Sequence, residues 1–96
     1  MSTEQDRSGV DDEPLPKLDF SIFVMSIIAS AHVHLGEMAA PDGHVERSLD
    51  LAQQDLDLLS LLEEKTKGNL TGDEERLLTQ ALAELRARFA EASKEP

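Results

Sequence analysis

The chain has 96 residues, a formal net charge of −11 and no Cys. This length suffices for one small domain, and the lack of Cys excludes disulfides, thiolate metal sites and Cys nucleophiles. Because the chain is acidic and has neither Trp nor Tyr, we expect no binding to nucleic acid or to an anionic membrane surface.

The first 17 residues are predicted to form a disordered tail. They are polar and acidic, include Pro14 and Pro16, and carry too few apolar side chains to offset the entropy lost on ordering. We expect the tail to act as a solubiliser, with a docking peptide as the alternative. It lacks the apolar segment beside basic residues that marks a secretory signal, so the predicted location is the cytoplasm.

The first predicted helix runs from about residue 19 to 35, with Asp19 as its N-cap and Gly36 at its end. Its side chains are apolar on all sides except for two narrow polar seams. One seam holds Ser26, Ser30 and His34. Such a helix is either buried or in a membrane. Its uncharged stretch is shorter than the about 20 residues of a membrane span, so we expect burial and no membrane partner.

Two other helices of the same chain cannot surround the first one completely. We therefore expect a homo-oligomer, most simply a dimer, in which a second copy covers the remaining apolar surface. Small side chains in the seam would let two backbones approach closely. The predicted interface residues are Phe20, Phe23, Val24, Ile27, Ile28, Ser30, Ala31 and His34.

The remainder of the chain is predicted to form a helical hairpin. After a turn at residues 41–43, Ser48 or Asp50 begins a second helix, which ends at residues 68–69. Thr71 begins a third helix with a capping box, and this helix runs to about Ala92. The connection is short, which forces the two helices to be antiparallel.

Apolar residues recur at helical spacing along both hairpin helices. The second helix has Leu49, Ala52, Leu56 and Leu59 on one stripe, and the third has Leu78, Leu82, Leu85 and Phe89. The predicted fold is therefore all-α, with a three-helix domain at 18–92 that oligomerisation completes and a disordered C-terminus at 93–96.

The sequence indicates no catalytic, cofactor or metal site. His32, His34 and His44 are the only residues that resemble metal ligands. His32 and His34 point about 160° apart on a helix and cannot share a metal within one chain, although a pair formed across a symmetric interface stays open. Ser30 lies four residues before His34, but no third orienting group or oxyanion hole accompanies them.

Two blocks of sequence resemble a family of small bacterial proteins catalogued as domain of unknown function 1844. The first is the pattern over 19–26 together with Val-His-Leu-Gly at 33–36, and the second is the run over 61–71. Matching positions at 74–78 and 85–89 extend the resemblance over about residues 18 to 90. The resemblance implies a cytoplasmic, all-helical bacterial protein and carries no catalytic residues. It also implies relatives encoded beside translation factors and ribosomal proteins.

We therefore expect a non-enzymatic helical interaction module that self-associates through its apolar first helix. The alternative is an acidic accessory factor that binds a basic protein partner, in translation if the resemblance extends that far. A stable self-assembly in light scattering would favour the first hypothesis over the second.

Overall fold

The computed structural model describes residues 17–95, so the predicted tail lies outside the described residues except for Lys17. This part of the chain contains three α-helices and no strand, which confirms the all-α prediction there. The helices are α1 (Phe20–His34), α2 (Leu49–Lys65) and α3 (Gly72–Ser93).

Local signals fix both ends of α1 where the sequence predicted them. The Asp19 carboxylate accepts a hydrogen bond from the backbone N–H of Ile22 at 2.9 Å, as an N-cap does. At the other end Leu35 is the C-cap and Gly36 follows with φ of 81°. That left-handed conformation favours glycine and ends the helix.

The hairpin helices are capped in the same way. Ser48, rather than Asp50, is the N-cap of α2. Thr71 and Glu74 form the predicted capping box of α3, in which each side chain accepts a hydrogen bond from the other residue's backbone N–H. The third helix ends at Ser93, one residue beyond the predicted boundary.

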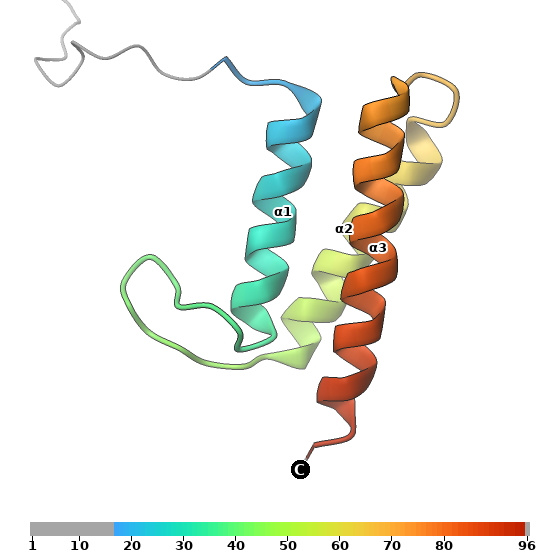
Figure 1. The fold of residues 1–96 in the computed structure, drawn as a ribbon. Helices are drawn as coiled ribbons and strands as arrows, with labels where there is room; N and C mark the ends of the chain where they lie inside the picture. Colours follow the sequence, from blue (N-terminus) through green and yellow to red (C-terminus); the bar gives the residue numbers. More distant parts are fainter. Residues whose placement is uncertain (1–16, 96) are drawn as a thin grey trace, which may run out of the picture.

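The core lies where the three apolar stripes meet. Helix α1 packs along α2 and α2 along α3, whereas α1 and α3 share a smaller contact. Figure 1 shows the helices side by side, with the α1–α2 loop extending away from them. The buried apolar residues are Val24, Ile27, Ala31, Leu35, Ala52, Leu56, Leu59, Leu78, Ala81, Leu82 and Leu85. Phe20, Leu49 and Phe89 pack against this cluster while partly buried, so the predicted stripes are the core.

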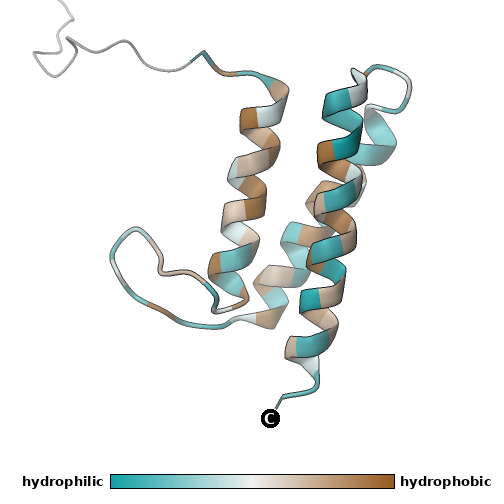
Figure 2. Ribbon diagram, viewed as in Figure 1, coloured by the Kyte–Doolittle hydropathy of each residue, from teal (hydrophilic) through white to brown (hydrophobic). Residues whose placement is uncertain are grey.

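One side of α1 stays uncovered by the chain. Figure 2 shows α1 mostly in apolar colours, whereas α3 alternates between hydrophilic and hydrophobic residues. Among the described residues, no helix is both long and apolar enough to cross a membrane. The exposed residues of α1 include Ile22, Phe23 and Met25, with exposed fractions of 39%, 45% and 56%.

Candidate functional site

A buried carboxylate joins α1 to α2. Asp55 is 6% exposed and is the buried charged residue of the part of the chain that the structure describes. The Ser30 hydroxyl donates to its Oδ1 at 3.2 Å, and Nδ1 of His34 lies 2.6 Å from its Oδ2. A buried carboxylate without such partners would be strongly destabilising, so these two side chains make its burial possible.

This geometry positions helices and does not align a nucleophile with a base. The Ser30 hydroxyl points its hydrogen bond at Asp55 and not at the imidazole of His34. The His34 contact becomes an ion pair when the imidazole is protonated. The carboxylate thus accepts from two residues one helical turn apart on α1, which fixes how α1 and α2 are aligned along their lengths.

The sequence pointed to Ser30 and His34 but not to their partner. Asp55 is 25 and 21 residues away from them along the chain. One signal was present, because Asp55 lies between Ala52 and Leu59 at helical spacing on the apolar stripe of α2. A lone Asp on a buried stripe needs a polar partner on a facing helix.

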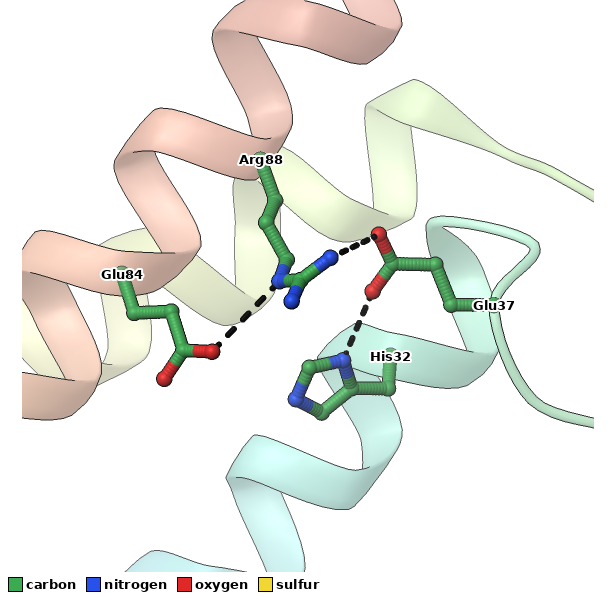
Figure 3. A network of polar contacts seen from close by, with 4 residues as sticks. All are labelled: His32, Glu37, Glu84 and Arg88. Carbon is green, nitrogen blue, oxygen red and sulfur yellow. Dashed lines mark hydrogen bonds and ion pairs between the residues drawn. The ribbon is translucent and has the colours of Figure 1, made fainter.

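A second polar network joins the end of α1 to α3 (Figure 3). Nδ1 of His32 lies 2.8 Å from Oε1 of Glu37, and Nη1 of Arg88 lies 3.2 Å from the other carboxylate oxygen. Nε of Arg88 also lies 3.5 Å from Glu84, one turn earlier on α3. The network therefore anchors the first residues of the α1–α2 loop on α3.

The network shifts the ionisation of Glu37. Burial by itself raises the pKa of this carboxyl group, but the hydrogen bond from His32 and the charge and hydrogen bond of Arg88 outweigh burial. The pKa of Glu37 is consequently below its ordinary value. The negative charge of Glu37 raises the pKa of Arg88 in return.

The three histidines are in separate surroundings. His32 contacts Glu37, His34 contacts Asp55, and His44 lies 3.3 Å from Glu46 in the loop. Among residues 17–95, no three His, Asp or Glu side chains are grouped as a metal ion would require.

The structure uses most of the predicted interface residues inside the chain. Val24, Ile27 and Ala31 are at most 8% exposed and lie in the core. Phe20 and Ile28 pack partly buried against the core, and Ser30 and His34 contact Asp55. Phe23 is the member of the predicted set that is exposed.

The exposed side of α1 is formed mainly by residues outside the predicted set. We call it the outer α1 surface, and it consists of Ile22, Phe23, Met25, Ser26 and Ala29. The helical wheel of the sequence could have identified Ile22, Met25, Ser26 and Ala29, because they lie away from the stripe of buried residues. Phe23 lies at the edge of that stripe.

A family model described as "Domain of unknown function (DUF1844)" matches residues 17–91. No curated protein and no solved structure matches the chain.

Proposed function

Because the chain belongs to the family described as Domain of unknown function (DUF1844), we propose its function from its surface. We propose that it is a small non-enzymatic interaction module that forms a homodimer through the outer α1 surface. The observation that carries the proposal is that Ile22, Phe23 and Met25 are each between 39% and 56% exposed on one helix. Contiguous apolar surface of this kind marks an interaction site in a soluble domain.

Electrostatics favour this surface for contact between two copies. Each copy has a formal net charge of −11, so most of its surface repels a second copy. Helix α1 has no Asp, Glu, Lys or Arg anywhere between Phe20 and His34. Two copies that meet along α1 therefore bury apolar side chains without burying an unpaired fixed charge.

The shape of the outer α1 surface suits a close helix pair. Ser26 and Ala29 are small and exposed, and they lie one helical turn beyond the larger side chains of Ile22 and Met25. The distance between packed helices depends on the size of the side chains at the contact. The small residues at this turn let two α1 helices approach, while the larger side chains of the preceding turn pack against the second copy.

The test replaces exposed residues, because charges at the buried Val24 or Ile27 would unfold the chain with or without a dimer. We expect sedimentation equilibrium to show a dimer for the wild type at micromolar concentration and a folded monomer for Ile22→Asp/Met25→Asp. Val45→Asp is the control, since Val45 is a 60% exposed apolar residue in the loop. A wild-type monomer, or a double variant that still dimerises, would overturn the proposal.

A second candidate function is an acidic accessory factor that binds a basic protein. The observation that favours it is the row of Asp50, Asp57 and Glu64 along one edge of α2. Within residues 17–95, none of the three forms an ion pair with a Lys, Arg or His.

A further inference from the structure

Helix α2 has a second apolar side that the chain does not cover. Leu51, Leu58 and Leu61 are exposed by 45%, 43% and 49%. Their spacings of seven and three residues place them on one side of the helix. Ala52, Leu56 and Leu59 form the buried side. We call the exposed row Leu51, Leu58 and Leu61 the outer α2 strip.

Acidic residues border this strip along its length. Asp50, Asp57 and Glu64 repeat every seven residues, as Leu51 and Leu58 do, so the acids run parallel to the strip. All three are exposed. Within residues 17–95, the one side-chain hydrogen bond to these three acids comes from the neutral amide of Gln53, which donates to Asp57 at 2.9 Å.

The surface is hollowed at the Leu51 end of the strip. Val33 and His34 of α1, Ala40 and His44 of the loop, and Leu51 line this hollow. Asp42 and Glu46 line it as well, which adds two carboxylates at that end. The hollow therefore combines apolar walls with negative charge.

We propose that the outer α2 strip docks an amphipathic helix of a protein partner, with Lys or Arg flanking the apolar residues of that helix. Leu51, Leu58 and Leu61 lie at i, i+7 and i+10 on α2, so the strip runs along the helix and offers contacts to the apolar anchors that such a partner helix places at i, i+3 and i+7. The acidic border would pair with its basic edge, and a long basic side chain fits the hollow. The inference rests on the second candidate function and goes beyond it by naming the surface and the partner's chemistry.

A second copy of this chain fits the strip poorly. In a two-fold symmetric contact each surface meets itself, so the acids Asp50, Asp57 and Glu64 of both copies would lie along the same interface. Like charges held close together oppose association. The strip therefore suits a basic partner, whereas the uncharged outer α1 surface suits self-association.

The experiment measures the anisotropy of a labelled helical peptide with Leu at its a and d positions and Lys at the flanking positions. The full chain should bind this peptide, and it should not bind the matched peptide with Glu in place of Lys. Asp50→Asn/Asp57→Asn/Glu64→Gln should weaken binding by about tenfold, because three ion pairs at the rim are lost. Leu58→Ser/Leu61→Ser should weaken it by a similar factor.

The control variant removes the same charge elsewhere. Glu75→Gln/Glu84→Gln/Glu91→Gln changes three exposed acids on α3 and should alter binding by no more than about twofold, as expected for distant rim charges. Equal losses in both charge variants, with Leu58→Ser/Leu61→Ser unchanged, would overturn the strip assignment but leave a basic partner possible. No binding of the Lys peptide by the wild type would overturn both. Dimerisation of all variants is measured in parallel. No variant should weaken it, because none changes the outer α1 surface, and the two charge variants should affect it equally because they carry the same net charge.

Discussion

Nδ1 of His34 lies 2.6 Å from Oδ2 of Asp55, which connects the last residue of α1 to the middle of α2. Ser30 donates to the same carboxylate from one turn earlier on α1. A contact between apolar side chains tolerates small shifts along a helix, whereas a hydrogen bond requires a donor and an acceptor within about 3.2 Å. The Asp55 contacts therefore select one alignment of α1 on α2.

The first prediction concerns Asp55. Asp55→Ala leaves the Ser30 hydroxyl and the His34 imidazole without their buried acceptor, so the free energy of unfolding should fall by about 2 kcal/mol. Urea denaturation measures the change. Asp57→Ala is the matched control, because Asp57 is exposed two residues further along α2, and it should cost no more than about 0.5 kcal/mol. Equal effects of the two substitutions would contradict the structural role of Asp55.

The second prediction is a pH dependence that arises from Glu37. Its pKa in the folded chain is below the ordinary value of 4.5, so the folded state binds fewer protons than the unfolded state in that range. The stabilisation is therefore complete above pH 4.5 and is lost as the pH falls through the lower folded pKa. Glu37 is 35% exposed at its side chain, and solvent screening limits the effect to less than about 1 kcal/mol.

Thermal melts of wild type and Glu37→Gln between about pH 3 and 6 measure this effect, since that range spans the usual titration of Glu. The difference in stability between the two proteins should shrink toward acidic pH. Arg88→Ala is the control, because it removes the charge and the hydrogen bond that, after the hydrogen bond from His32, lower the pKa of Glu37. In that background the difference should depend less on pH. If the difference in stability between wild type and Glu37→Gln stayed constant over this pH range, the network would contribute no pH dependence.

Most helix boundaries could be predicted because their signals are local. The exception is the end of α2, which the sequence placed at residues 68–69 and the structure places at Lys65. Asp19, Thr71 and Glu74 each act within three residues of their hydrogen-bond partners, so the sequence itself contains both halves of each cap. The start of α2 was ambiguous between Ser48 and Asp50. Both are good capping residues. The choice between them depends on the path of the loop that connects α1 to α2, and no local sequence pattern specifies that path.

The candidate site was less predictable because it depends on contacts that are distant in the sequence. His34 and Ser30 were visible as polar residues on an apolar helix, but their acceptor is on another helix. The prediction of the interface residues was limited for a similar reason. A helix that is apolar all round does not show which side its neighbours cover, and the packing of α2 and α3 left Ile22 and Met25 exposed while it buried Val24 and Ile27.

The third prediction compares three glycines. Gly36 and Gly68 have φ of 81° and 84°, so a side chain at either position is strained. A Cβ at Gly68 meets no atom within 4 Å, whereas one at Gly36 lies 3.2 Å from Cβ of Arg47. Gly68→Ala should therefore cost about 1 kcal/mol, and Gly36→Ala should cost more because Arg47 must also move.

Gly72 is the control for both glycines. It is the first residue of α3 and lacks the positive φ of the other two, and the nearest atom to a Cβ built on it is a guanidinium nitrogen of Arg76 at 3.6 Å. Gly72→Ala should leave the stability unchanged or raise it slightly, because alanine loses less entropy on folding. If thermal melts rank Gly72→Ala as the most damaging of the three, the left-handed assignments of Gly36 and Gly68 are wrong.

The last prediction separates the two proposed contacts by their response to salt. Two copies that each carry −11 repel one another, so screening should strengthen dimerisation through the uncharged outer α1 surface. The Lys peptide is attracted to the acidic border of the outer α2 strip, so screening should weaken its binding. The screening length falls from about 30 Å at 0.01 M salt to about 8 Å at 0.15 M. Over this range the dimer dissociation constant should fall and the peptide dissociation constant should rise.

Sedimentation equilibrium and peptide anisotropy on the same samples measure the two constants. Asp50→Asn/Asp57→Asn/Glu64→Gln should reduce the salt dependence of peptide binding, because it removes the carboxylates that lie nearest the peptide. Glu75→Gln/Glu84→Gln/Glu91→Gln carries the same net charge and should reduce it less, because those carboxylates are on α3. Dimerisation that weakens with salt would place charged side chains in the contact between copies. The outer α1 surface, which has none, would then not be the surface that joins them.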